Sequence, residues 1–191
     1  MKKKFIDPLI KRKAELTKKI QFYKKNIPLP SVVEISESGT CNRTCSFCPR
    51  SAPDYNDIKE FISDKLIIKL SKQLSVYDYS GIFLFSGFVE PLIDKNIFNL
   101  LSIVKKYLPK AKIEMVTNGD VLDEERTKKL FQSGLSTLLV SIYDGKKEAD
   151  DMENLLKRSG LKEDQFKVRH RYLSESESFG ITLSNRSGMM D

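Results

Sequence analysis

"TCNRTCSFCPRS", residues 40–51, contains all three cysteines of this 191-residue chain: Cys41, Cys45 and Cys48. Their spacing, Cys-x3-Cys-x2-Cys, comes shortly after a strand pattern around Val33, in which apolar and polar residues alternate. Cysteines this close together can place several thiolates around one compact inorganic centre. An odd number of cysteines argues against a framework of disulfides.

Three interpretations of this loop compete. A [4Fe–4S] cluster held by three cysteines leaves one iron open for a further ligand. A zinc ion would need a fourth ligand, for which the single histidine, His170, is available, but structural zinc sites usually pair two-ligand knuckles. Cysteines that bind no metal usually lie scattered through a core, whereas these share a loop with the polar residues 42–44. The pattern therefore favours the cluster.

The composition is that of a globular protein, with 40% hydrophobic and 31% charged residues. No apolar run approaches the roughly 18 residues that a membrane-spanning helix needs. The basic start of the chain has no apolar stretch behind it, so it does not resemble a secretory signal. We therefore expect a cytoplasmic protein.

The positive charge is concentrated at the N-terminus. Residues 1–25 hold ten Lys or Arg and two Asp or Glu, a net charge of +8 within a total of +7, so the rest of the chain is nearly neutral. Spacing predicts an amphipathic helix from Lys13 to Tyr23, with Leu16, Ile20 and Tyr23 facing inward. The alternative is a binding surface for an acidic partner. We do not expect a nucleic-acid partner, because aromatic and basic residues are not interleaved.

Strand and helix patterns alternate along the remaining chain. After the first strand, five further segments rich in branched and aromatic residues are expected to form strands: residues 81–86, 112–118, 137–143, 166–173 and 180–186. Helical patterns lie between the first five strands. Three are expected to begin at the capping residues Ser63, Asp94 and Asp123, and a fourth runs from about Ala149 to Gly160.

This order predicts an α/β fold with parallel strands and right-handed crossovers. A closed barrel of eight such units takes about 250 residues. We therefore expect a partial, open (β/α)6 barrel of the TIM type, formed by residues 30–191 and preceded by a basic arm or helix at residues 1–29.

"CNRTCSFCPRS" resembles the signature of the radical S-adenosylmethionine (radical SAM) enzymes. In that family the three cysteines bind a [4Fe–4S] cluster, and the amino and carboxylate groups of SAM chelate the fourth iron. The residue before the third cysteine is typically aromatic, as Phe47 is here, and its backbone lies near the adenine. The resemblance extends over about residues 30–188.

"FSGFVEPL", residues 85–92, resembles the Gly-Gly-Glu-Pro element of the same family, whose backbone carbonyls bind the SAM amino group. Gly87, Glu90 and Pro91 match this element, and Val89 stands where glycine is usual. A β-branched residue is a departure at a place where a backbone approaches a ligand. An ordinary turn between strand and helix is the alternative.

Further polar residues at predicted strand ends match family positions. The resemblance implies that Asn118 belongs to a cofactor-binding turn, that Ser141 contacts the ribose and that Asn185 lies near the adenine. Alternation places Arg171 on the inner face of its strand, where an arginine needs an anion such as the SAM carboxylate. An ordinary turn, a strand-end serine without a role and a surface ion pair are the structural alternatives.

The resemblance is greatest to radical SAM proteins of the SPASM type, but the cysteine-rich C-terminal extension that binds their additional clusters is not found in this sequence. The implied function is reductive cleavage of SAM to a 5′-deoxyadenosyl radical, which abstracts hydrogen from a substrate that no motif identifies. The alternatives are a degenerate partner subunit that binds cluster or SAM without catalysis, and a zinc-binding module. The basic arm would suit an acidic electron donor such as flavodoxin or ferredoxin.

Overall fold

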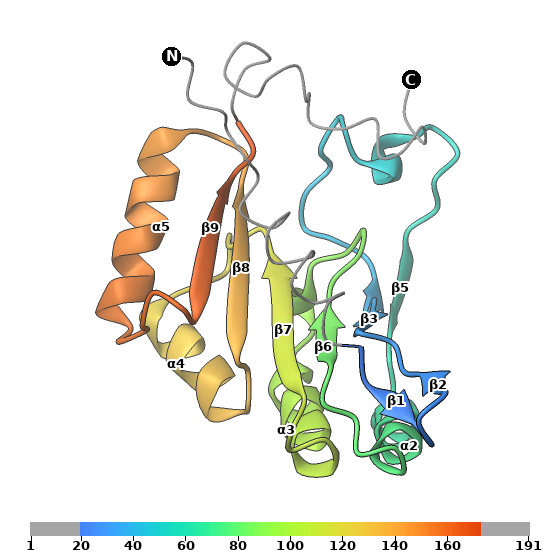
Figure 1. The fold of residues 1–191 in the computed structure, drawn as a ribbon. Helices are drawn as coiled ribbons and strands as arrows, with labels where there is room; N and C mark the ends of the chain where they lie inside the picture. The colour runs from blue at the N-terminus through green and yellow to red at the C-terminus, as the bar shows by residue number, and fades with distance from the viewer. Residues whose placement is uncertain (1–19, 173–191) are drawn as a thin grey trace, which may run out of the picture.

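The computed structural model describes residues 20–172, which are built around a parallel sheet of five strands in the order β3-β6-β7-β8-β9 (Figure 1). All four neighbouring pairs are parallel. The strands are β3 (Val32–Ile35), β6 (Ile82–Phe85), β7 (Lys112–Thr117), β8 (Thr137–Ile142) and β9 (Phe166–His170). Within the described residues the sheet is open, which confirms the predicted α/β class and partial barrel. The sixth predicted strand, residues 180–186, lies outside the described residues.

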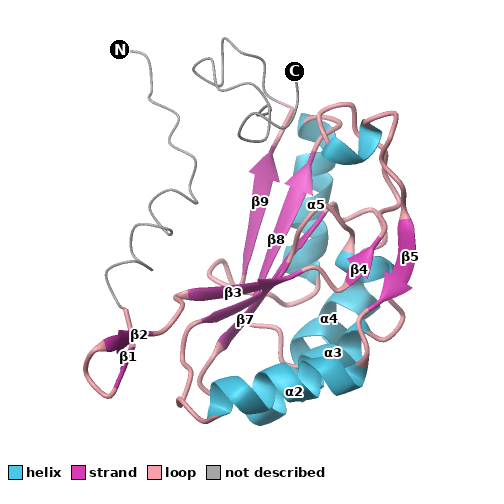
Figure 2. Ribbon diagram, turned by 90° about the vertical axis from the view of Figure 1, so that its right-hand side faces the viewer, coloured by secondary structure: helices cyan, strands magenta, loops and turns pink. Residues whose placement is uncertain are grey.

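Four α-helices lie on the same side of this sheet (Figure 2). They are α2 (Asp64–Ser75), α3 (Ile97–Tyr107), α4 (Glu124–Gln132) and α5 (Lys146–Arg158). Alternate strand residues such as Phe83, Met115 and Val140 pack against buried helix residues such as Leu101 and Leu130 in one apolar core. The intervening strand positions face the other side of the sheet, because side chains alternate along a strand.

The predicted helix starts are confirmed at two of three positions. The side chains of Ser63 and Asp123 accept hydrogen bonds from the first turns of α2 and α4. Asp94 was the wrong cap, because Pro91 opens a short 3-10 helix, η2 (Pro91–Ile93), and α3 begins only after Asn96. The Asp94 carboxylate instead accepts the backbone N–H of Asn96 at 2.8 Å.

Two small hairpins were not predicted. One pairs β4 (Ser38–Gly39) with β5 (Ile58–Phe61), and the cysteine loop belongs to the connection between these two strands. Because all four residues of β5 are exposed, they carry no alternation of buried and exposed positions that a sequence pattern would reveal. The other pairs β1 (Phe22–Tyr23) with β2 (Ile27–Pro28).

This second hairpin corrects the helix predicted from Lys13 to Tyr23, whose earlier part, residues 13–19, lies outside the described residues. Tyr23 belongs to β1, and Ile20 is 44% exposed instead of facing inward. The Gln21 amide donates to the carbonyls of Tyr77 and Asp78 at 3.1 and 3.0 Å. The end of the predicted arm is thus fixed to the connection between α2 and β6.

No helix in residues 20–172 has the length and apolar character required to cross a membrane.

Candidate functional site

A pocket opens at the carboxyl ends of the parallel strands, where α/β barrels bind their ligands. Its walls come from the cysteine loop after β3, the loop after β6, the end of β7 and the residue after β8. The lining residues are Cys41, Arg43, Cys45, Phe47, Cys48, Arg50, Gly87, Phe88, Val89, Glu90, Val116, Thr117, Asn118 and Tyr143. Four chain segments, distant in sequence, therefore meet in one pocket, and three of them are predicted site regions: the cysteine loop, the element with Gly87 and Glu90, and the turn with Asn118.

The cysteine loop is closed by its own backbone. The N–H of Cys48 donates to the carbonyl of Cys45 at 2.9 Å, and the Ser51 hydroxyl donates to the carbonyl of Cys48 at 2.8 Å. All three thiols are free and half-buried. Burial raises the pKa of the Cys41 and Cys45 thiols, and nearby cysteines raise it further. Such thiols become thiolates most readily when a positive metal centre binds beside them.

The side chains of residues 20–172 do not form a ready site for a single metal ion. Among residues 20–172, no three Cys, His, Asp or Glu side chains converge closely enough to hold one metal ion. A zinc ion needs all its ligands around one atom, whereas a [4Fe–4S] cluster offers a separate iron to each thiolate. His170, the remaining candidate for zinc, bonds the Tyr172 hydroxyl at 2.7 Å and does not line the pocket. The described residues therefore do not form the alternative zinc site.

Two of the three aromatic residues that line the pocket, Phe47 and Tyr143, stack on each other. The rings of Phe47 and Tyr143 have centroids 5.1 Å apart and an interplanar angle of 29°. Phe47 precedes the third cysteine and Tyr143 follows β8, so this contact joins the cysteine loop to a strand end. The predicted position of Phe47 in the site is consistent with this geometry.

Glu90 lies in the pocket wall, but its carboxylate is directed into the protein. Its Oε1 accepts from the Thr117 hydroxyl at 2.6 Å and from the Leu92 N–H at 3.0 Å, and its Oε2 accepts from the Asn118 N–H at 2.7 Å. Burial raises the pKa of Glu90, while these three donors oppose the shift. Glu90 thus connects the loop after β6 to the end of β7.

The backbone conformation requires a glycine at position 87 but not at position 89. Gly87 has φ +137°, and a Cβ there would lie 2.2 Å from the Ser36 hydroxyl oxygen. Val89 is not among the described non-glycine residues with positive φ, which are Lys24, Lys25 and Asp78. The substitution of valine for the usual glycine therefore imposes no left-handed backbone strain at position 89.

We expect Gly87→Ala to destabilise the protein by about 1–3 kcal/mol from backbone strain alone, with the contact to Ser36 adding to this. Urea denaturation of the isolated protein measures the change. Gly145→Ala is the matched control, because Gly145 has φ +152° but nothing lies within 4 Å of its Cβ position. Equal losses in the two variants would show that the Ser36 contact contributes nothing.

Arg50 holds the C-terminal side of the cysteine loop. Its side chain is 4% exposed and forms an ion pair with Asp57. Its Nη1 donates to the carbonyls of Gly39 and Phe88 at 2.9 and 3.3 Å. One buried guanidinium therefore joins the cysteine loop to the β4–β5 hairpin and to the loop after β6.

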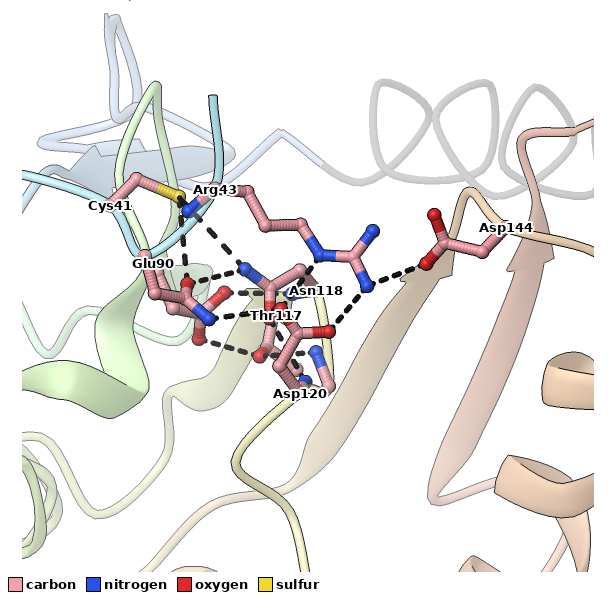
Figure 3. Close-up of polar contacts among 9 residues, drawn as sticks. Cys41, Arg43, Glu90, Thr117, Asn118, Asp120 and Asp144 are labelled. Carbon is pink, nitrogen blue, oxygen red and sulfur yellow. Dashed lines mark hydrogen bonds and ion pairs between the residues drawn. The ribbon is translucent and has the colours of Figure 1, made fainter. Parts of the chain in front are cut away.

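Arg43 holds the N-terminal side of the same loop (Figure 3). Its Nε and Nη2 donate to the two oxygens of Asp120 at 2.7 and 2.5 Å, and Nη2 also pairs with Asp144 at 2.6 Å. Hydrogen bonds to Arg43 lower the pKa of Asp144. The side chain thereby reaches the loops after both β7 and β8.

Of the site residues expected from the sequence, two described ones do not line the pocket. Ser141 is buried on the sheet face opposite the helices, in register with Arg169 of the neighbouring strand. Arg171 follows β9, and its N–H donates to the Ile142 carbonyl at 2.8 Å. Asn185 lies outside the described residues. The sequence interpretation missed Arg43, Arg50 and Tyr143, although all three adjoin motifs that it used.

A second buried carboxylate lies just before the cysteine loop. Glu37 is 1% exposed, and neither of its carboxylate oxygens has a well-formed hydrogen bond to a described residue. Burial, together with the negative charges of Glu90 and Asp94, raises the pKa of Glu37 to about 8. The folded protein therefore holds a proton on Glu37 at neutral pH.

We expect Glu37→Gln to be more stable than the wild type at pH 8, by about 2–4 kcal/mol, and of similar stability at pH 5. The folded pKa lies above the ordinary value, so folding binds a proton between about pH 4.5 and 8 and wild-type stability falls as pH rises through that window. Glutamine carries no such penalty. Urea denaturation at the two pH values measures the difference, with the exposed Glu34→Gln as control. A constant difference across this range would contradict the prediction.

The chain thus has the fold of a partial α/β barrel, with an open parallel sheet and a pocket lined by three cysteines at the carboxyl ends of its strands. A loop with three cysteines at this spacing is typical of proteins that bind an iron–sulfur cluster. The family described as the Radical SAM superfamily matches residues 35–183, and the chain belongs to this superfamily. The predicted family is thereby confirmed.

Two curated relatives are enzymes. The chain is 32% identical over 165 residues to the S-adenosyl-L-methionine-dependent 2-deoxy-scyllo-inosamine dehydrogenase of Niallia circulans, covering 84% of this chain and 61% of that enzyme. It is 27% identical over 114 residues to the GTP 3′,8-cyclase of Aquifex aeolicus (strain VF5), covering 59% of this chain and 35% of that enzyme. The chain therefore spans less than two thirds of the length of either relative.

Solved structures show the same fold. BtrN in complex with AdoMet and 2-DOIA matches with a TM-score of 0.69 and 29% identity, covering 85% of this chain and 63% of BtrN. The structure of anSMEcpe with bound AdoMet matches with a TM-score of 0.55 over 72% of this chain and 43% of anSMEcpe. At 21% identity, the second likeness concerns the fold alone.

Proposed function

We propose that this chain is the core of a radical SAM enzyme that binds a [4Fe–4S] cluster through Cys41, Cys45 and Cys48 and SAM in the adjoining pocket. The observation that carries the proposal is that all three cysteines line one pocket together with the loop after β6 and the end of β7. Its similarity to BtrN, which was solved with AdoMet, supports the assignment.

Cys41, Cys45 and Cys48 would hold the cluster, and the chemistry that it would supply is one-electron reductive cleavage of SAM to methionine and a 5′-deoxyadenosyl radical, which would abstract hydrogen from the substrate. The protein's part is to bind, orient and shield these groups. Phe47 and Tyr143, which stack on each other, form an aromatic wall of the pocket. Gly87 allows the loop after β6 to pass close to Ser36, which follows β3. Asn118 presents its amide beside Cys41.

Glu90 supports SAM binding indirectly, because its carboxylate is already bonded to three protein donors. For the positions away from the described pocket lining, we retain Ser141 as a ribose contact, Arg171 as a partner of the SAM carboxylate and Asn185 as a contact near the adenine. These roles rest on the family resemblance of the sequence.

We also propose that residues 1–29 form an arm preceding a core of residues 30–191. Its net charge of +8 over residues 1–25 would attract an acidic electron donor such as flavodoxin or ferredoxin. The cytoplasmic location, expected because the sequence shows neither a secretory signal nor a long apolar run, stays a prediction.

The test is anaerobic reconstitution with iron and sulfide, followed by reduction in the presence of SAM and measurement of 5′-deoxyadenosine. We expect iron and labile sulfide to bind and 5′-deoxyadenosine to form. Formation of a cluster without SAM cleavage would contradict the proposed catalytic activity and favour the degenerate partner subunit. The valine at position 89 does not itself favour that alternative, because its backbone has no positive φ. Zinc without iron or labile sulfide would overturn the cluster itself.

A further inference from the structure

The segment of the cysteine loop around Cys45 has little apolar support of its own. Thr44 and Ser46, its neighbours on both sides, are exposed, as is Asn42. A loop whose side chains point into water is not fixed by burial, and its shape must come from hydrogen bonds or ion pairs. What holds Cys45 in place is therefore a question of polar contacts.

Besides the backbone hydrogen bond from Cys48 to Cys45, the side chain of Arg43 attaches this segment to other parts of the fold. This side chain is 24% exposed, and its guanidinium donates two hydrogen bonds to Asp120 while also forming an ion pair with Asp144. A two-pronged pair with a carboxylate fixes orientation as well as distance. Because Asp120 follows β7 and Asp144 follows β8, these contacts attach Arg43 to the ends of two neighbouring strands of the sheet.

The same carboxylate also holds the preceding residue. The Asn42 amide donates to Asp120 at 2.9 Å, and the Asn118 amide donates to Asn42 Oδ1 at 2.7 Å. Two successive loop residues are thus attached to the loop after β7. The backbone N–H of Arg43 donates to the sulfur of Cys41 at 3.4 Å, which brings the first cysteine into the same network.

Arg43 also reaches the far side of Cys45 through an aromatic contact. Its guanidinium carbon lies 5.7 Å from the ring centroid of Tyr143, which stacks on Phe47. Cys45 therefore lies in sequence between Arg43 and Phe47, and both of these residues contact the ring of Tyr143.

We infer that Arg43 is a positioning residue, acting through Asp120 and Asp144 to hold the cysteine loop in the shape that receives the cluster. The inference rests on the proposed function. Groups that orient metal ligands commonly affect metal affinity by about 10–100-fold. Fixing the loop before binding removes the need to order it when the cluster assembles.

The experiment compares two variants. Arg43→Met keeps an unbranched apolar side chain and removes the guanidinium group, whereas Arg43→Lys keeps the positive charge but loses the paired N–H donors. The matched control is Arg158→Met, because Arg158 forms an exposed ion pair with Glu124 at 2.9 Å and does not line the pocket that holds the cysteines. The readouts are melting of the apo protein, iron and sulfide bound per folded chain at limiting iron, and the electron paramagnetic resonance spectrum of the reduced cluster.

We expect Arg43→Met to melt close to the Arg158→Met control, to bind about 10-fold less iron at limiting supply, and to give a broadened spectrum. Arg43→Lys should recover part of the iron but not the wild-type spectrum. Asp144→Asn, which leaves Asp120 in place, should give a smaller loss in the same direction and serves if Arg43→Met does not fold.

Full iron uptake and a wild-type spectrum in Arg43→Met would overturn the inference, as would iron loss only in proportion to unfolded protein. These outcomes differ from failure of the proposed function, in which the wild-type chain itself takes up no cluster.

Discussion

Replacing Cys45 by alanine is expected to lower 5′-deoxyadenosine formation by more than about 100-fold, since even groups that merely orient metal ligands change affinity or activity by about 10–100-fold. Cys45 is one of three free thiols that line the pocket, and the 191-residue chain has no fourth cysteine to replace it. Removing it leaves one iron of the cluster without a protein ligand. The variant should reconstitute with little iron and labile sulfide under anaerobic conditions.

The control for this experiment is Ser46→Ala, because Ser46 is the exposed neighbour of Cys45. It changes the same loop by a similar volume without touching a thiol. Cys41→Ala and Cys48→Ala should behave like Cys45→Ala, since each thiolate would hold a different iron. Undiminished 5′-deoxyadenosine from the Cys45 variant, with wild-type iron content, would remove the cluster assignment.

The strands and the position of the site could be predicted because their signals are local. β7 and β8 are short apolar runs between helices with polar caps, and the cysteines are adjacent in sequence. The parallel order then brings the residues after β3, β6 and β7 to one edge without further information. This is why Cys41, Gly87 and Asn118, far apart in the chain, were expected together.

The features that escaped prediction depend on tertiary contacts. The Asp94 cap failed because Pro91 began a 3-10 helix first, and β5 has no buried face to mark it. Arginines such as Arg43 and Arg50 are usually exposed. The neighbouring sequence does not distinguish an arginine that binds a carboxylate 77 residues away, as Arg43 binds Asp120, from one that is solvated. Charged side chains gain their roles from partners that the fold supplies.

Glu90→Ala is expected to destabilise the fold by about 3 kcal/mol or more, because it leaves three donors without their acceptor, each at about 1–3 kcal/mol if it stays buried. The donors are the Thr117 hydroxyl and the N–H groups of Leu92 and Asn118. Glu90→Gln keeps one acceptor oxygen but presents an N–H to the Asn118 N–H. Its loss should therefore be intermediate, and urea denaturation at pH 8 measures both.

Glu37 provides the matched control, since it is as deeply buried as Glu90 but its carboxylate has no well-formed hydrogen bond to a described residue. At pH 8, amide replacement should therefore have opposite signs at the two positions, stabilising at Glu37 and destabilising at Glu90. The two sites are also coupled, because the negative charge of Glu90 contributes to the raised pKa of Glu37. In the double variant the stabilisation from Glu37→Gln should be smaller than in the wild-type background. Destabilisation of equal size at both positions would mean that burial alone, without the three hydrogen bonds, determines the contribution of Glu90.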